Sequence, residues 1–526
     1  GAASYMRSVF GNYCLTTHCR ILYGMSPDSS PHDTTEPHEI GDEDDRPNVV
    51  LVVMDTARAV DTVPADAEVT PTLASLADSG TEFTRAYTSA PWTLPSHASL
   101  FTGLYTAAHG AHGGHTYLDT DHETLPEAFR SAGYETVGVS NNCWITGEFG
   151  FGRGFDRFRK GWQYVQSEVD TGAIVRATGI KERLAALRTQ LFAGNPAVTL
   201  ANVAYERYLC SDDGGSRTTD WVEGWLADRR TDAPFFLFCN YIEPHIEYDP
   251  PREYAERFLS PAAVDEAIGL RQDPRAFDVG DYDLTERECE LLRGLYRGEL
   301  ASVDAQLGRL REALQAADEW EDTILVVCGD HGENIGEHGF FGHQYNLHGT
   351  VVHVPLVLTG GPFQDGGQRE AFVQLLDLVP TLLDATGIAA PELAMQTQGR
   401  SFHPGSTAPP REAVYAEHIQ PQPSVAALEA RFGELPARVR AFDRSLRSVR
   451  TDGATYVRGS DGSRRLFLSG DRAEEHNRID QRPALAAQLD TRLDDWLGTV
   501  ERDHATGRPV DMSASTEQRL ADLGYL

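Results

Sequence analysis

The stretch NVVLVVMD, residues 48–55, decides the fold class of this chain. It is a continuous run of apolar and mostly β-branched residues, which is typical of a strand buried on both faces of a parallel sheet. Similar runs recur at residues 135–140, 234–242, 323–330 and 354–360, with helical patterns between them. This alternation predicts an α/β fold, a layered sandwich around a large and mainly parallel sheet, in which ligands bind beyond the carboxyl ends of the strands.

The texture of the sequence changes along the chain. Residues 1–46 are polar, acidic and proline-bearing, which predicts a flexible leader. Residues 47–405 carry the alternation and predict the main domain. Residues 160–232 interrupt it with helical patterns, so we expect an insertion there that acts as a lid over the site. Residues 406–526 predict a smaller α+β subdomain with a short antiparallel sheet.

The charge of the chain is strongly negative. Its 526 residues include 79 Asp plus Glu against 46 Lys plus Arg, a formal net charge of −33, and Lys160 and Lys181 are its two lysines. Such a surface repels nucleic acid and anionic membranes, so we exclude both as partners. Acidity spread along the whole chain with few lysines is typical of proteins from salt-accumulating halophiles, whose high salt screens self-repulsion.

The cysteine content and the hydropathy of the chain predict its cellular compartment. The chain has seven cysteines, an odd number, and several lie inside apolar runs, which indicates reduced thiols. No run of eighteen apolar residues predicts a membrane span, and the start of the chain has no secretory pattern. We therefore expect a cytoplasmic location.

Acidic and imidazole groups gather where predicted strands end. Asp55 ends the run at 48–55, where an N-cap of the next helix is the common alternative. The segment CGDHGENIGEHGFFGHQ, residues 328–344, places Asp330 and His331 at another strand end, and His343 follows on a glycine-rich loop. Asp and His are an oxygen and nitrogen ligand pair for a divalent cation, so these residues predict a metal site.

Two further segments carry candidate catalytic groups. In SAPWTLPSHASLFTG, residues 89–103, Thr93 stands in a stiff loop before a predicted helix. A hydroxyl held at a helix N-terminus beside a metal can attack phosphorus or sulfur, although a capping threonine is common there. In NYIEPHIEYDPP, residues 240–251, His245 follows a strand, and it is either a general acid or a loop histidine.

Together these segments resemble the sulfatase family of the alkaline phosphatase superfamily. The resemblance runs from residue 48 to residue 526 and rests on ordered pieces: NVVLVVMDTAR, TPTLASLADSGTEFTRAYTSAPWTLPSHASLFTGLYTAAHG, PFFLFCNYIEPHIEYDPP, VVCGDHGENIGEHGFFGH, VVHVPLVL, EEHNRIDQRPALAAQL and RLADLGYL. It implies an alkaline-phosphatase-like three-layer fold, a divalent metal (Mn²⁺, Mg²⁺, Ca²⁺ or Zn²⁺) and hydrolysis of sulfate or phosphate esters.

The departures from the family pattern concern the nucleophile and its neighbours. Sulfatases have at position 93 a Cys or Ser that is oxidised to formylglycine, and this chain has Thr93. The signature arginine is His97, the second acidic residue after Asp55 is Thr56, and the Lys-x-His segment aligns with Asn141 and Cys143. The changed set resembles superfamily members that use a Thr nucleophile on phosphorus.

The resemblance therefore implies one metal held by Asp55, Thr93, Asp330 and His331. It implies Thr93 and His245 as catalytic residues, and it places His97, Asn141 and His343 at the substrate.

We expect an anionic small-molecule or glycan ester as substrate, with phospho substrates favoured by the chemistry of threonine. Transfer of a phospho group to a glycan or lipid alcohol, and a non-catalytic relative that binds an anion, are the alternatives.

Overall fold

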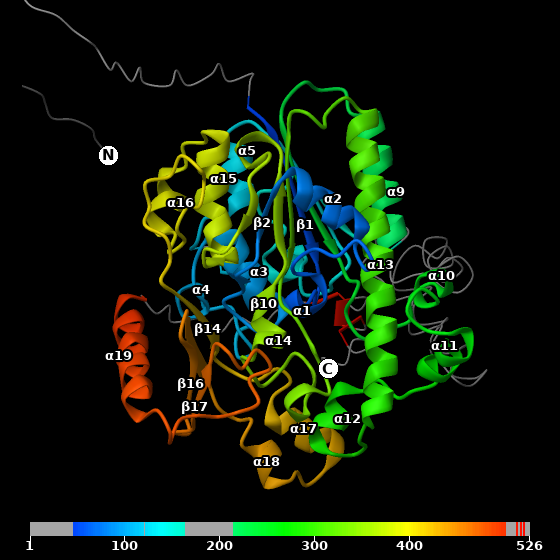
Figure 1. Ribbon diagram of the computed structural model, residues 1–526. Helices are drawn as coiled ribbons and strands as arrows, with labels where there is room; N and C mark the ends of the chain where they lie inside the picture. Colours follow the sequence, from blue (N-terminus) through cyan, green and yellow to red (C-terminus); the bar gives the residue numbers. More distant parts are fainter. Residues whose placement is uncertain are drawn as a thin grey trace, which may run out of the picture. The chain divides into compact units, whose positions relative to one another are not determined.

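The structure is a computed structural model that describes residues 46–119, 121–163 and 214–500, together with residues 512, 513, 516, 517, 519 and 520 (Figure 1). The predicted leader, apart from residue 46, and residues 164–213 of the predicted insertion lie outside the described residues. The end of that insertion is helix α9 (Gly215–Asp228).

An eight-stranded sheet forms the centre, in the order β12-β2-β11-β7-β1-β6-β4-β5. The neighbours β7, β1, β6, β4 and β5 run parallel to one another, whereas β11 is antiparallel to β7 and to β2. The strand bounds are β1 (Asn48–Met54), β2 (Thr81–Phe83), β4 (Glu135–Ser140), β5 (Arg157–Lys160), β6 (Phe235–Tyr241), β7 (Thr323–Gly329), β11 (Leu356–Thr359) and β12 (Gly367–Arg369). The predicted large, mainly parallel sheet is confirmed.

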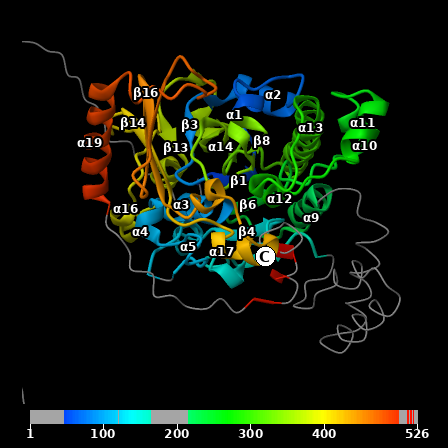
Figure 2. The same cartoon turned by 90° about the horizontal axis from the view of Figure 1, so that it is seen from below.

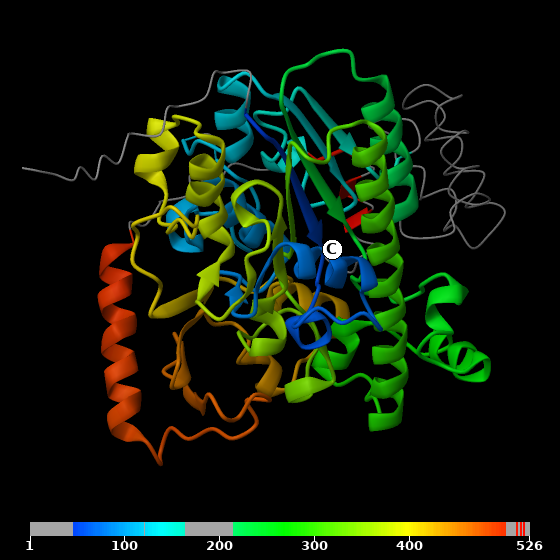
Figure 3. The same ribbon diagram turned by 45° about the horizontal axis from the view of Figure 1, so that its top comes forward.

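Helices cover both faces of this sheet, which makes three layers (Figures 1 and 3). Strand β1 shows why: Val49, Leu51 and Val53 enter one hydrophobic cluster, and the alternate residues Val50 and Val52 enter the other. The first cluster contains helices α3 (Thr93–Thr102), α5 (Leu125–Ser131) and α15 (Leu378–Thr386). The second contains α2 (Pro71–Ser79), α9 and the 31-residue helix α13 (Glu286–Ala316).

The C-terminal part forms a four-stranded antiparallel sheet in the order β14-β15-β16-β17, as the sequence predicted. Its strands are β14 (Ala413–His418), β15 (Leu446–Thr451), β16 (Ala454–Gly459) and β17 (Arg464–Leu468). Helix α19 (Pro483–Thr499) packs against it through Leu489, Leu493 and Trp496 (Figure 2).

Shorter elements connect these layers and build the loops at the sheet edge. They are α1 (Ala59–Thr62), β3 (Ala86–Tyr87), α4 (Thr106–His109), α10 (Arg252–Ala255), α11 (Pro261–Ile268), α12 (Pro274–Val279), β8 (Asn334–Ile335), β9 (Phe341–Gly342), α14 (Gly349–Val352), β10 (His353–Val354), β13 (Val373–Gln374), α16 (Pro391–Gln396), α17 (Val425–Phe432) and α18 (Ala437–Arg440). Strand β3 lies between β10 and β13 in a small second sheet and leads into the loop before Thr93.

Two observations concern compartment and membrane. Within the described part of the chain, no helix is both long and apolar enough to span a bilayer. The cysteines of that part, Cys143, Cys239, Cys289 and Cys328, are free thiols and buried.

Candidate active site

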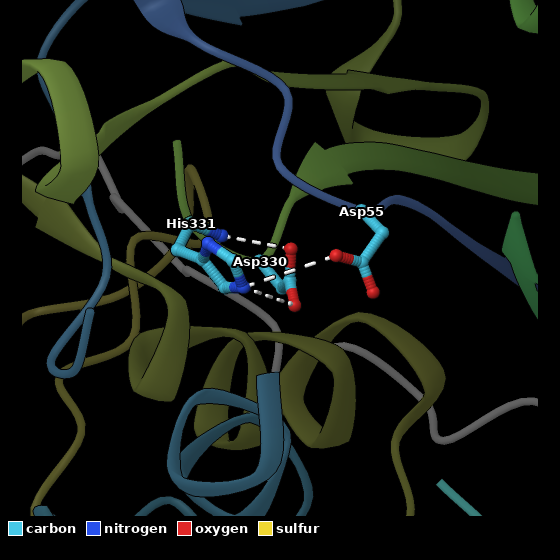
Figure 4. Close-up of side chains that lie close together, drawn as sticks. All are labelled: Asp55, Asp330 and His331. Carbon is cyan, nitrogen blue, oxygen red and sulfur yellow. Dashed lines mark hydrogen bonds and ion pairs between the residues drawn. The ribbon is translucent and has the colours of Figure 1, made fainter. Parts of the chain in front are cut away.

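Asp55 and Asp330 meet because their strands are neighbours. Strands β1 and β7 pair in parallel with Met54 opposite Gly329, so the residues that follow at the carboxyl ends lie side by side. His331 is the next residue, and all three side chains are fully buried. One ligand atom from each of Asp55, Asp330 and His331 lies within 4.8 Å of the other two (Figure 4).

In each of the two carboxylates, one oxygen accepts hydrogen bonds that fix its orientation, and the other oxygen is left for a cation. Asn142 Nδ2 donates to Asp55 Oδ2 (2.6 Å), and the amides of Thr56 and His331 donate to Asp330 Oδ1 (3.1 and 2.8 Å). Asp55 Oδ1 and Asp330 Oδ2 have no hydrogen-bond partner among the described residues. Burial, with the repulsion from Asp330, raises the pKa of Asp55 well above its usual value, and burial raises that of Asp330 to about 6. Two unpaired buried oxygens fit a divalent cation, which compensates both charges.

His331 completes this donor set. Its Nδ1 lies 2.9 Å from the carbonyl oxygen of Gly332, and because a carbonyl only accepts, Nδ1 carries the proton. Nε2 therefore presents its lone pair, 3.4 Å from Asp330 Oδ2 and 3.8 Å from Asp55 Oδ1. Burial lowers the pKa of His331 to about 4, so the ring is neutral near pH 7, as a metal ligand must be.

Thr93 is the first residue of α3, and Trp92 is the N-cap, so the hydroxyl is not used for capping. The Thr93 side chain is fully buried. Its Oγ1 lies 3.2 Å from His331 Nε2 and accepts from Asn142 Nδ2 at 3.3 Å. Asn142 thus holds the threonine hydroxyl and the Asp55 carboxylate together at the mouth of the predicted metal site.

His97 lies one helical turn after Thr93 and closes one side of the site. Its Nδ1 donates to the carbonyl oxygen of Thr93 (2.9 Å) and lies 3.4 Å from Asp330 Oδ2. Burial lowers the pKa of His97. The ring replaces the family's signature arginine with a neutral donor that contacts a predicted metal carboxylate.

His343 and His245 continue a row of rings that starts at His331. The ring centroids of His331 and His343 are 4.4 Å apart, and those of His343 and His245 are 5.3 Å apart. Burial lowers the pKa of His245 to about 3 and that of His343 well below its usual value. Near pH 7 both rings are therefore neutral.

Each of these two rings is oriented by a hydrogen bond at Nδ1. His245 Nδ1 lies 2.5 Å from the carbonyl oxygen of Ile246, and His343 Nδ1 lies 2.9 Å from Glu333 Oε1. Glu333 Oε2 in turn accepts from the hydroxyl of Tyr248 (2.5 Å). Glu333 and Tyr248 are not among the residues that the sequence predicts, because a lone Glu or Tyr gives no signal until the fold brings it beside His343.

Asn141 lies on a different side of its strand end from Asn142. Its side-chain oxygen accepts from Thr218 of α9 (3.1 Å) and makes no hydrogen bond to the metal-site residues within the described ranges. The next residue, Asn142, makes both contacts to the site. Because side chains at a strand end alternate in direction, the presence of two adjacent asparagines could have signalled both as candidates.

The charge of Arg519, late in the chain, acts on His245. Burial is the largest cause of the lowered pKa of His245, and the charges of His331, Arg275 and Arg519 lower it further, in that order. The segment is anchored by Lys160 Nζ, which donates to Ser513 Oγ (3.3 Å) and Thr516 Oγ1 (3.4 Å). Arg519 opens the segment RLADLGYL that carries part of the resemblance, but nothing in the sequence links it to His245, 274 positions before it (519 against 245).

A family model described as Sulfatase matches residues 47–388. The chain belongs to the sulfatase family. It is thus a hydrolase that acts on ester bonds, with a buried Asp-Asp-His candidate metal site. It is 24% identical over 478 residues to Arylsulfatase K of Bos taurus, covering 85% of this chain and 81% of that protein.

Two solved structures have folds similar to that of this chain. The phosphonate monoester hydrolase of Agrobacterium radiobacter superposes with a TM-score of 0.64 and 21% identity, covering 87% of this chain and 96% of that one. BT1596, a 2-O GAG sulfatase, superposes with a TM-score of 0.62 and 17% identity, covering 90% and 96%. The sulfatase-like fold expected from the sequence is confirmed.

Proposed function

We propose that this protein is a metal-dependent hydrolase of anionic esters that uses Thr93 as its nucleophile and that favours phospho substrates over sulfate esters. The observation that carries this proposal is that the buried Thr93 Oγ1 lies 3.2 Å from His331 Nε2. The same nitrogen lies 3.4 and 3.8 Å from two carboxylate oxygens that have no hydrogen-bond partner in the described part of the chain. No capping duty occupies this hydroxyl.

Asp55, Asp330 and His331 would hold one divalent cation, with Thr93 Oγ1 as a fourth neighbour. When bound there, such a cation supplies Lewis acidity, which lowers the pKa of a nearby hydroxyl and neutralises negative charge on a phosphoryl group.

The side chains around Thr93 prepare the first chemical step. Asn142 donates to Thr93 Oγ1 and fixes its direction. Thr93 Oγ1 loses its proton and forms a bond to phosphorus, and the bond from phosphorus to the leaving-group oxygen breaks. The leaving oxygen takes up a proton, which balances the one that Thr93 lost. The products of this step are a phosphothreonine at position 93 and a free alcohol.

The row of histidines serves the second step. Water attacks the phosphorus of phosphothreonine, the bond between phosphorus and Thr93 Oγ1 breaks, and the threonine hydroxyl recovers a proton. His245 is neutral, and its Nδ1 is occupied by the Ile246 carbonyl, so Nε2 is the atom that can accept a proton from that water. Arg275 and Arg519, whose charges both lower the pKa of His245, would supply positive charge toward an anionic substrate.

The preference for phosphorus follows from the nucleophile. A formylglycine hydrate can eliminate sulfate from its second hydroxyl, whereas a threonine ester has no such hydroxyl and must be hydrolysed at phosphorus or sulfur. The structural relatives named above include one phosphonate monoester hydrolase and one GAG sulfatase, so an anionic small-molecule ester and a glycan ester are both substrate classes to offer.

The test compares Thr93→Val and Thr93→Ser with Thr102→Val, a matched control at the other end of the same helix whose hydroxyl bonds the Ala98 carbonyl. Aryl sulfate, phosphate monoester, phosphate diester and phosphonate ester are offered with Mn²⁺, Mg²⁺, Ca²⁺ or Zn²⁺. High salt is included because the acidic side chains of a protein with a net charge of −33 are expected to repel one another, and salt screens this repulsion.

We expect turnover of a phospho ester that Thr93→Val abolishes and Thr102→Val leaves intact. We also expect a phosphoryl group on the peptide that contains Thr93 when the reaction is quenched early. Turnover of sulfate esters alone contradicts the phospho preference. Turnover only with an added alcohol identifies a transferase, and metal binding without any turnover identifies an anion-binding relative.

A further inference from the structure

A buried carboxylate joins the C-terminal sheet to the loops of the site. Glu474 follows β17, and the residue is only 4% exposed. Its Oε2 accepts from His348 Nδ1 and from the amide of Gly349, both at 3.0 Å. Its Oε1 pairs with Arg450 Nη1 of β15 at 2.9 Å. Glu474 therefore connects the short helix α14, which begins at Gly349, to the C-terminal sheet.

Helix α14 contacts both halves of the proposed site. The carbonyl oxygen of Val351 accepts from the amide of Gly332, the residue after His331, at 2.6 Å. The carbonyl oxygen of Val352 accepts from the amide of Thr88, five positions before Thr93, at 2.9 Å. This one helical turn therefore fixes the positions of two loops, the one after His331 and the one before Thr93.

The contact with the metal loop has no slack. A Cβ added to Gly332 would lie 2.2 Å from the carbonyl oxygen of Thr350, so the loop after His331 lies directly on α14. The two loops are also bonded to each other, because Thr88 Oγ1 lies 2.8 Å from Ser96 Oγ, which donates to the carbonyl oxygen of Asp330 at 2.6 Å. A shift of α14 would therefore move Asp330 and His331 relative to Thr93.

The Oε1 atom of Glu474 is connected, through Arg450, to the loop before Thr93 as well. The guanidinium of Arg450 lies 5.1 Å from the ring centroid of Tyr87, which directly precedes Thr88. Burial alone would raise the pKa of Glu474, but Arg450 and His348 outweigh it and hold that pKa well below its usual range. Glu474 also has a left-handed backbone, φ 50°, which is unfavourable for a residue other than glycine.

We propose that Glu474 is a positioning residue for the catalytic centre: it holds α14 so that Asp330 and His331 stand at metal-binding distance from Asp55 and Thr93. This inference rests on the proposed metal site. It makes the C-terminal sheet a part of the catalytic apparatus, because without that sheet α14 has no partner on the side of Glu474.

The experiment needs a control that separates positioning from general stability. Asp377 is such a control, since its buried carboxylate accepts from the amides of Gln374 and Arg400 and from the guanidinium of Arg411. Through Arg411 it joins the segment before β14 to the main domain, and none of its hydrogen bonds within the described ranges goes to α14 or to residues 328–333. The variants are Glu474→Gln, Glu474→Ala, Asp377→Asn and Asp377→Ala in the full chain.

Three measurements are compared: thermal stability without metal, Mn²⁺ affinity by calorimetry, and hydrogen exchange of the segment 330–352. We expect both sets of variants to lose stability. We expect only the Glu474 variants to bind Mn²⁺ about tenfold more weakly, as removal of an outer support of metal ligands typically does. In these variants the amides of segment 330–352 exchange faster, and kcat falls with little change in KM. Glu474→Gln, which keeps one oxygen for Gly349, loses less than Glu474→Ala.

Two outcomes overturn the inference. One is a wild-type Mn²⁺ affinity and exchange pattern in Glu474→Ala, and the other is an equal loss of Mn²⁺ affinity in Asp377→Ala. Failure of the proposed function would look different, because the wild-type protein itself would then bind no divalent cation or turn over no ester.

Discussion

Replacing Asp330 by asparagine is expected to stabilise the metal-free protein while removing its response to metal. Asp330 is fully buried next to Asp55, and its Oδ2 lacks a hydrogen-bond partner among the described residues. An asparagine keeps Oδ1 for the amides of Thr56 and His331, and its amide group can donate to His331 Nε2, which lies 3.4 Å from the replaced oxygen. The substitution removes a buried charge and leaves the same shape.

The magnitude follows from the pKa of Asp330, which burial raises from 3.8 to about 6. The folded protein holds this proton over a pH range in which the unfolded chain has lost it, so the stability of the metal-free protein falls as pH rises from 3.8 to 6 and is constant above that. The loss is about 1 kcal/mol at pH 4.5 and about 3 kcal/mol at pH 8. An unfolding entropy on the order of 1 kcal mol⁻¹ K⁻¹ for a chain of this length converts the larger value to about 3 °C in Tm.

The assay is thermal unfolding of wild type and Asp330→Asn in EDTA at pH 4.5 and pH 8, followed by the same scans with Mn²⁺. In EDTA we expect Asp330→Asn to be more stable by about 3 °C at pH 8 and by about 1 °C at pH 4.5. With Mn²⁺ at about 100 times its Kd, the wild type gains about 2.7 kcal/mol and the variant does not. An equal difference at both pH values, or a variant that is less stable at pH 8 in EDTA, would refute the reasoning.

Three other perturbations test separate parts of the site. Asn142→Ala removes the amide that joins a metal carboxylate to the nucleophile, so kcat should fall about 100-fold while the fold is retained by circular dichroism. Gly332→Ala places a Cβ 2.2 Å from the Thr350 carbonyl oxygen, and calorimetry should show weaker Mn²⁺ binding together with a stability loss of about 1–3 kcal/mol. Arg519→Gln removes one of the two arginine charges that lower the pKa of His245, and steady-state kinetics should show KM for an anionic ester about tenfold higher with a smaller change in kcat.

Much of the fold was predictable, because the pattern of burial is written locally in the chain. The run at residues 48–55 predicted a doubly buried strand, and β1 does divide its side chains between two hydrophobic clusters. The antiparallel orientation of β11 was not predicted, since an apolar run of that length has the same composition in either direction.

The candidate site was predictable where a chemical residue type coincides with a strand end. Asp55, Asp330 and His331 were selected for that reason, and the structure brings them within 4.8 Å of one another. Asn142 was passed over for its neighbour, because one position along an extended chain turns a side chain to the other side. The roles of these residues in catalysis remain the prediction that the experiments above address.

The sequence by itself determined the layered α/β architecture, the strand ends at which ligands gather and the choice of threonine as the hydroxyl at position 93, because these follow from local burial, periodicity and side-chain chemistry. Only the tertiary structure decided which groups surround that hydroxyl. Glu474 and Arg519 come from segments far along the chain. The hydrogen bond of Glu474 to α14 and the effect of the Arg519 charge on His245 exist only once the sheets are packed. Both residues open segments that carry the resemblance, EEHNRIDQRPALAAQL and RLADLGYL, but the sequence does not show which partners folding brings near them.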